Sequence, residues 1–198
     1  RDPALNPPPP SSMVHAMKAT LALLAAALLL SPSASLRAEE DSIKVSEFTF
    51  TYGKPWVRQQ AASSMRAGQF LYDHEDESLE DIELVIFFFG AGGGGGIQAN
   101  IDRWLGQFEG APESKVEEKE MGGKKVTLLT AKGTFLDTMA GAGPFSGGPK
   151  TPKPDTTMLA AILPSEQGAV FLKLTGPTKS VEAMREAFDA FVASPFVQ

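Results

Sequence analysis

A run of small residues carries the clearest chemical potential in the sequence. It extends from Gly90 to Gly96, after an apolar segment predicted as a strand and before a segment predicted as a helix. The run fits the spacing G-x-G-x-x-G, in which backbone N–H groups at a helix N-terminus bind phosphate or another anion. Together with one cation on the following helix, the candidate ligand-binding residues are Gly92, Gly93, Gly94, Gly95, Gly96 and Arg103.

An alternative interpretation of this run is a flexible hinge between strand and helix. A tract of identical glycines matches almost any glycine motif, and no Gly-Lys-Ser/Thr follows it, so there is no Walker A sequence. The chain is also too short for a full doubly wound nucleotide-binding domain. We favour the hinge over a nucleotide site and predict no cofactor.

Other clusters of reactive side chains have simpler explanations. Residues 73–81 are rich in carboxylates, which are calcium ligands, but their spacing is not that of an EF-hand, so we expect a solvated hairpin loop. His74 lies among these carboxylates and is not a promising metal ligand. Glu117, Glu118 and Glu120 leave a glycosidase pair open, but a solvated edge strand explains them more simply. We therefore predict no catalytic residue and no metal site.

The two tryptophans are expected in the core. Trp104 lies on an apolar stripe of the helix that begins at Ile97, and Trp56 is expected to pack under the same sheet, so an exposed platform for carbohydrate is disfavoured. Arg103 lies off the stripe. We expect it to be solvated or paired with Asp102 or Gln107.

Alternating and helical patterns define the elements that position these residues. Residues 84–89 are apolar on both faces, which predicts a central strand covered on both sides. Residues 137–155 are rich in glycine and proline, which predicts a long flexible or functional loop. The predicted strands are 48–52, a short strand from Trp56, 65–72, 83–89, 115–121, 124–135, 158–163 and 169–175, and the predicted helices are 97–108 and a last one capped by Thr178 or Ser180.

The order of these elements predicts an α+β fold. Short turns join consecutive strands, so the sheet is expected to be mostly antiparallel, with about six to eight strands and two amphipathic helices packed on it. The second helix carries its apolar stripe on Val181, Met184, Phe188, Phe191 and Val192.

The N-terminal part of the chain has the pattern of a secretory signal peptide. Met17-Lys18 precedes a 12-residue apolar run, Ala19–Leu30, which is shorter than the about 20 residues of a membrane span. Cleavage is expected after Ala38, or alternatively after Ser35. The predicted domains are a disordered segment 1–16 that is either upstream translated sequence or an artificial addition, a signal peptide 17–38 and a single globular domain 39–198 that includes the loop 137–155. We expect an exported protein, periplasmic or secreted.

Composition narrows the classes of partner. The net charge is −6 and cysteine is absent, which argues against nucleic acid and anionic lipid, and rules out disulfides and thiolate chemistry. The expected partner is a protein or an envelope component. No integral membrane span is predicted.

Several segments resemble known proteins. The opening Pro55-Trp56, the sheet interrupted by one helix, the late paired hairpins and the closing helix resemble the PsbP-like fold. Residues 84–90, the glycine run, Asn100-Ile101-x-Arg103-Trp104-x-x-Gln107-Phe108 and residues 171–177 look like shared segments of an uncharacterised family of exported bacterial proteins. The resemblance implies an antiparallel sheet between helical layers and a binding role more often than an enzymatic one.

These observations lead to one expected function and two alternatives. The expected function is an exported, non-catalytic binding or accessory module. One alternative is a small periplasmic enzyme that uses Gly90–Gly96 as an anion cradle. The other is a structural protein associated with the envelope.

Overall fold

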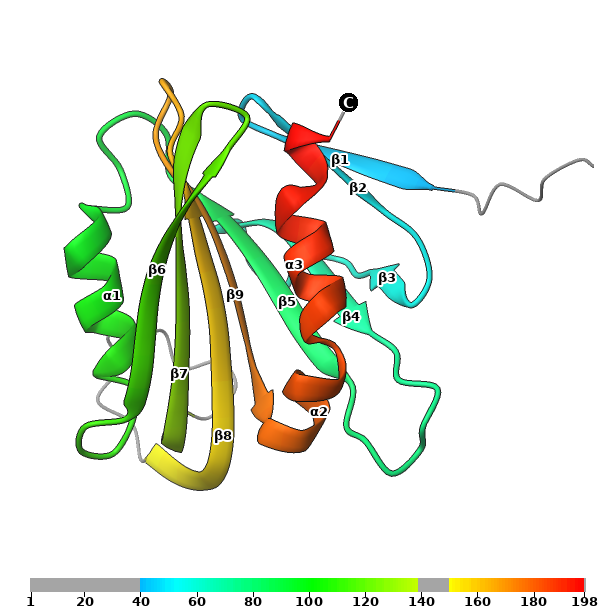
Figure 1. Ribbon diagram of the computed structural model, residues 1–198, viewed down its shortest axis with the longest axis vertical. Helices are drawn as coiled ribbons and strands as arrows, with labels where there is room; N and C mark the ends of the chain where they lie inside the picture. The colour runs from blue at the N-terminus through cyan, green and yellow to red at the C-terminus, as the bar shows by residue number, and fades with distance from the viewer. Residues whose placement is uncertain (1–39, 139–149, 198) are drawn as a thin grey trace, which may run out of the picture. The chain divides into compact units, whose positions relative to one another are not determined.

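A seven-stranded antiparallel sheet forms the centre of the protein, in the order β3-β4-β5-β9-β8-β7-β6 (Figure 1). The computed structural model describes residues 40–138 and 150–197, all within one compact unit. The strands of this sheet are β3 (Trp56–Arg58), β4 (Arg66–Tyr72), β5 (Ile82–Phe88), β6 (Glu113–Met121), β7 (Lys124–Thr138), β8 (Lys150–Leu163) and β9 (Val170–Pro177). A separate two-stranded sheet contains β1 (Asp41–Val45) and β2 (Phe48–Tyr52).

In the part of the chain that the structure describes, three helices and one 3-10 turn accompany the sheet. They are α1 (Ile97–Leu105), α2 (Thr178–Ala183) and α3 (Arg185–Ala193), followed by the 3-10 turn η1 (Ser194–Phe196). The α+β prediction is confirmed. Within the residues described, none of the helices is both long and apolar enough to cross a membrane.

The first face of the sheet carries the larger apolar core. Side chains of β4, β5, β8 and β9 on this face pack against β1, β2, α2 and α3. Phe191 of α3 lies at the centre, with its ring centroid 5.5 Å from Phe50, 5.3 Å from Trp56 and 5.1 Å from Phe70. The five residues of the predicted stripe of the last helix are all buried, so that prediction is confirmed.

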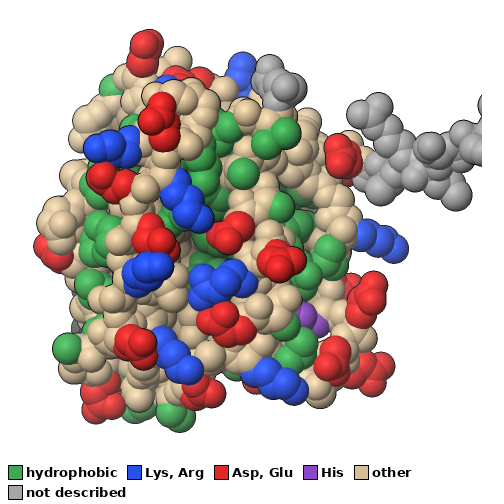
Figure 2. Space-filling model, viewed as in Figure 1, with side chains coloured by type: hydrophobic (Ala, Val, Ile, Leu, Met, Phe, Trp, Pro, Cys, Tyr) green, Lys and Arg blue, Asp and Glu red, His purple; other side chains and the backbone are tan. Residues whose placement is uncertain are grey.

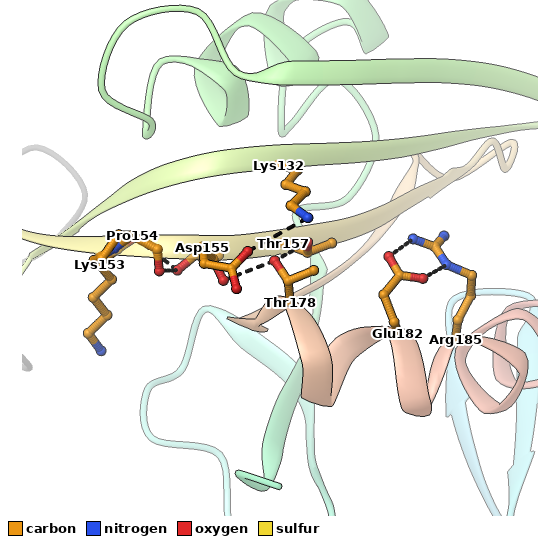
Figure 3. Close-up of polar contacts among 9 residues, drawn as sticks. Lys132, Lys153, Pro154, Asp155, Thr157, Thr178, Glu182 and Arg185 are labelled. Atoms are coloured by element: carbon orange, nitrogen blue, oxygen red, sulfur yellow. Dashed lines mark hydrogen bonds and ion pairs between the residues drawn. The ribbon is translucent and has the colours of Figure 1, made fainter.

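The capping prediction for the last helix was wrong. The helix is divided at Met184, and Pro177 takes the N-cap position of α2 without a side-chain cap. Thr178 Oγ1 instead donates to the Asp155 carbonyl oxygen at 2.9 Å and lies 2.9 Å from Thr157 Oγ1 (Figure 3). These bonds tie the start of α2 to β8.

The prediction that 137–155 is a loop was wrong at both ends. The two ends of this range are paired strands. Strand β7 extends to Thr138, β8 begins at Lys150, and Asp137 lies opposite Thr151. Lys153 Nζ pairs with Asp137 Oδ2 at 2.7 Å across this ribbon. Asp155 accommodates a bend in β8 with a φ of 48°, and Lys132 Nζ lies 3.7 Å from its carboxylate. Residues 139–149 lie outside the described part.

Strand β6 forms one edge of the sheet, as predicted for an exposed charged strand. Glu118 and Glu120 are exposed, and ion pairs join Lys115 to Glu117 and Lys125 to Glu118 at 2.9 and 3.2 Å. Acidic and basic side chains are intermixed over the face that Figure 2 shows. Charge of both signs along an exposed edge disfavours pairing with another strand.

Candidate functional site

The glycine loop, Gly90–Gly96, connects the end of β5 to the start of α1. Four of its residues have a left-handed backbone that side chains other than glycine rarely adopt. Their φ angles are 75° at Gly90, 75° at Gly92, 79° at Gly94 and 78° at Gly95. The glycine content is therefore required by the backbone path itself.

Close packing on aromatic side chains adds a second requirement for glycine. A Cβ atom on Gly93 would lie 2.3 Å from the carbonyl oxygen of Phe89, and one on Gly94 would lie 2.7 Å from the ring of Phe171. Neither distance is possible without movement of the loop or the rings. The loop is thus packed down onto the end of β5 and onto β9.

Asn100 holds the helical end of the loop. Its side chain is buried, and its Nδ2 donates to the carbonyl oxygens of Gly94 at 2.8 Å and Gly96 at 2.9 Å. Its Oδ1 accepts from Arg103 Nη1 at 2.9 Å. One asparagine therefore connects the glycine loop to the cation predicted as part of the same site.

Arg103 lies beside the loop. Its Nη2 is 3.8 Å from the position that a Cβ of Gly95 would take. The side chain is exposed, as the solvated alternative predicted. The alternative pairing with Asp102 or Gln107 was wrong, because Arg103 donates to Asn100. Among the described residues Arg103 belongs to none of the ion pairs.

Most of the predicted ligand-binding residues share one centre, and they differ in what else they contact. Gly94, Gly95, Gly96 and Arg103 meet around Asn100, whereas Gly93 lies against Phe89, which follows β5. Gly94 also packs against the ring of Phe171 on β9. A Cβ on Gly92 would meet nothing within 4 Å. Helix α1 begins without a side-chain cap at Gly96, so N–H groups of its first turn have no acceptor in the helix.

An aromatic ladder extends from α1 to the end of β5 on the second face of the sheet. It consists of Trp104, Phe171, Phe89 and Phe87, with successive ring centroids 6.3, 6.1 and 6.2 Å apart. Trp104 and also Trp56 are buried, as predicted. Phe89, however, is 46% exposed, and Phe87 is half-buried.

The prediction that 84–89 is covered on both sides was therefore wrong at its end. The strand is central in the sheet, and Leu84, Val85 and Ile86 are buried. Helix α1 packs its Trp104 over β7, β8 and β9. An apolar sequence pattern cannot tell a strand that is covered along its whole length from one whose last residues reach the surface.

A polar network lies on the same face of β4 and β5. Glu83 accepts from Arg66 Nη1 at 2.8 Å and from Gln69 Nε2 at 2.6 Å, and Gln69 Oε1 accepts from the backbone N–H of Ala62 at 2.9 Å. These groups satisfy one another, so they connect the segment before β4 to the sheet.

Lys173 is the one charged side chain of β9 and also lies on this second face. It stands between Val85 of β5 and Ala160 of β8 in the strand register, and its Nζ donates to Gln107 Oε1 and lies 5.5 Å from the centre of the Phe135 ring. Burial lowers the pKa of Lys173 to about 8, and the negative charge of Asp137 partly opposes this effect.

The acidic segment between β4 and β5 is organised by local bonds. The backbone N–H of His74 donates to Asp81 Oδ1 at 3.1 Å, that of Ser78 donates to Asp76 Oδ1 at 2.9 Å, and the His74 ring contacts Tyr72. Within residues 40–138 and 150–197, no group of His, Asp and Glu side chains is arranged to hold a metal ion.

Three side chains of this surface were not identified from the sequence: Asn100, Phe89 and Lys173. An asparagine in the first turn of a helix after a glycine run is a usable signal for the first, since it can satisfy free loop carbonyls. A lysine within an otherwise apolar strand is a signal for the third. No feature of the sequence pattern indicated that Phe89 is exposed.

Comparison with known proteins shows similarity in fold. No protein-family model matches the chain, and no curated protein sequence matches it. The chain is similar to cyanobacterial PsbP from Synechocystis, at 12% identity over 84% of this chain and 96% of that one, with a TM-score of 0.47.

Two further solved structures are similar to a comparable degree. Protein PA94 of unknown function from Pseudomonas aeruginosa has 11% identity, with 81% of this chain and 99% of that one covered and a TM-score of 0.44. LpqN, involved in cell envelope biogenesis of Mycobacterium tuberculosis, has 12% identity, with 77% and 87% covered and a TM-score of 0.47. At these identities the likeness concerns the fold alone.

Proposed function

We propose that this chain is an exported, non-catalytic binding module that contacts a protein or an envelope component through Phe87, Phe89 and Arg103 beside the glycine loop. The observation that carries the proposal is the exposure of Phe89, a large aromatic residue that is 46% exposed. Aromatic residues and arginine are the side chains most enriched where protein interfaces derive their binding energy.

Rigidity of the surface supports this role. Phe89 is stacked on Phe87 with an interplanar angle of 11°, and it also contacts Phe171. Arg103 is oriented by Asn100. Contacts made before binding reduce the conformational entropy that these side chains lose when a partner binds, so more of the interaction energy appears as affinity.

The chemistry of the surface indicates the kind of partner. Arg103 adds a positive charge without an acidic partner among the described residues, next to the exposed phenylalanine. A partner that offers an apolar side chain and a carboxylate fits both groups. The signal-peptide pattern of Met17–Ala38 supports a location outside the cytoplasm, where such a partner would be an envelope component or another exported protein.

Site-specific crosslinking in the native host tests this proposal. A photoreactive phenylalanine analogue replaces Phe89 in one variant and Val116 in the matched control, since Val116 of β6 is 47% exposed and lies at the edge of the sheet. We expect a discrete crosslinked partner from position 89 only, and weaker binding of that purified partner to the Phe89→Ala and Arg103→Ala variants. Equal crosslinking from both positions, or none from position 89, would overturn the proposal.

The anion-cradle alternative is supported by a separate observation. The uncapped start of α1 at Gly96 offers N–H groups near Arg103. Titration with inorganic phosphate, followed by the amide signals of residues 95–99, separates this alternative from the binding module. Saturable shifts that disappear in Arg103→Ala would favour an anion site, whereas unchanged signals would exclude it.

A further inference from the structure

Lys173 is a partly buried cation to which the proposed function assigns no role. The strand register places it between Val85 and Ala160, and Phe171 precedes it by two residues on the same face of β9. The ring of Phe135 lies against its ammonium group. A lysine in such apolar surroundings normally has its charge balanced by a carboxylate.

Among the described residues, no carboxylate forms an ion pair with Lys173. The hydrogen-bond acceptor of Lys173 is the neutral amide oxygen of Gln107. An ammonium group has three N–H donors, so capacity for further acceptors remains. Lys173 as a residue is half-buried, so part of its surface meets solvent.

Neighbouring acidic groups are already engaged. Asp137 of β7 attracts Lys173 at longer range, but its carboxylate is paired with Lys153 of β8 at 2.7 Å. Glu83 of β5 lies on the same face and accepts from Arg66 and Gln69. Helix α1 carries the exposed Asp102 and Arg103, and the turn after it carries the exposed Glu109. In this segment, the amide oxygen of Gln107 accepts the hydrogen bond from Lys173.

We propose that Lys173, Gln107 and Phe135 form a subsite for the carboxylate of a ligand whose remaining part is apolar. The ammonium of Lys173 pairs with the carboxylate, Gln107 orients the ammonium by accepting one of its protons, and Phe135 contacts the apolar part. The proposal rests on residues separate from the Phe89 surface, so each can fail independently of the other.

Proton linkage follows directly from this assignment. The ligand requires the charged form of Lys173, whereas burial favours the neutral form. Binding is therefore constant at pH values below about 8, the pKa of Lys173 in the free protein, and weakens as the pH rises through that value. A carboxylic acid probe is ionised throughout this range, so the change belongs to the protein.

The experiment compares octanoate with 1-octanol, which shares its chain but has no charge. Binding is followed by the NMR signals of Gln107, Phe135 and Lys173 in the parent protein, in Lys173→Met and in Lys44→Met, where Lys44 is an exposed lysine of β1. We expect saturable shifts with octanoate only, a loss of affinity of about tenfold or more in Lys173→Met, and parent-like binding in Lys44→Met.

Several results would overturn the assignment. They are equal binding of octanoate and octanol, unchanged octanoate binding in Lys173→Met, shifts away from these three residues, or no decline in affinity above pH 8. Lys173→Arg keeps the charge and is expected to retain octanoate binding, which provides the test if Lys173→Met does not fold. Loss of octanoate binding in a folded Lys173→Arg variant would also contradict the proposal, because that variant keeps the positive charge.

Discussion

The two faces of the seven-stranded sheet are packed by different kinds of side chain. The first face meets β1, β2, α2 and α3 through an apolar core in which aromatic rings surround Phe191. The second face has a smaller core under α1, and beside it lie a half-buried lysine, a satisfied polar network and an exposed phenylalanine. The first face is therefore a closed apolar core, while the second also presents polar and exposed aromatic groups, to which we have assigned the proposed recognition roles.

Truncation of a central aromatic on each face tests this comparison most strongly. Phe191→Ala is expected to lower the free energy of unfolding by about 4 kcal/mol, because Phe191 is 2% exposed and contacts three other rings. Trp104→Ala on the second face is expected to cost about 3 kcal/mol, since its indole is 7% exposed and meets Phe171 by an edge. Denaturant melts measure both. Near-parent stability of Trp104→Ala would show that α1 contributes little to the fold.

Substitutions in the glycine loop separate packing from simple loop flexibility. Gly94→Ala places a Cβ 2.7 Å from the Phe171 ring at a φ of 79°, so a loss of about 2–3 kcal/mol is expected. Gly96→Ala is the matched control, because a Cβ there meets nothing within 4 Å and φ is −73°. Its cost is expected to be no more than about 1 kcal/mol, the difference between glycine and alanine at a helix N-cap. Similar melts for both variants would favour the hinge over the packed connection.

The fold was largely predictable from the sequence because local patterns determine most of it. Alternation identified β2, and the stripe ending at Val192 identified the face of α3 that is buried. The pairing of 137–138 with 150–151 was missed because prolines and glycines normally end strands, and an exposed two-stranded ribbon tolerates them.

The candidate site was predictable only in part. The glycine loop and Arg103 were identified by type and spacing, but their connection through Asn100 depends on the tertiary path of the loop. The exposure of Phe89 and the isolation of the Lys173 charge depend on where α1 ends over the sheet, which no local pattern encodes.

The pH dependence of stability is a smaller test of the second face. The pKa of Lys173 is about 8 in the folded protein against an ordinary value of 10.5, so the unfolded chain binds more protons between these values. Stability is expected to rise by about 2 kcal/mol as the pH increases from 8 to 10.5, allowing for screening of a half-buried group. Below pH 8 this contribution is constant. Urea melts of the parent and of Lys173→Met should differ in this slope, and identical slopes would show that Lys173 does not cause it.

The smallest expected effect belongs to Arg103, the exposed member of the Asn100 contact. Arg103→Ala removes one hydrogen bond at the surface, so its cost is expected to be about 0.5 kcal/mol. Asn100→Ala is the partner variant, and it leaves the carbonyl oxygens of Gly94 and Gly96 without their buried donor at a cost of about 1–3 kcal/mol. Denaturant melts of the two variants and of the double variant give the coupling between them. If Arg103→Ala proves as costly as Asn100→Ala, the arginine is needed to keep Asn100 in place, and its role is to support the loop. If instead Arg103→Ala melts like the parent but binds the partner more weakly, the two hydrogen-bonded residues have different roles. Asn100 then stabilises the loop, and Arg103 contacts the partner.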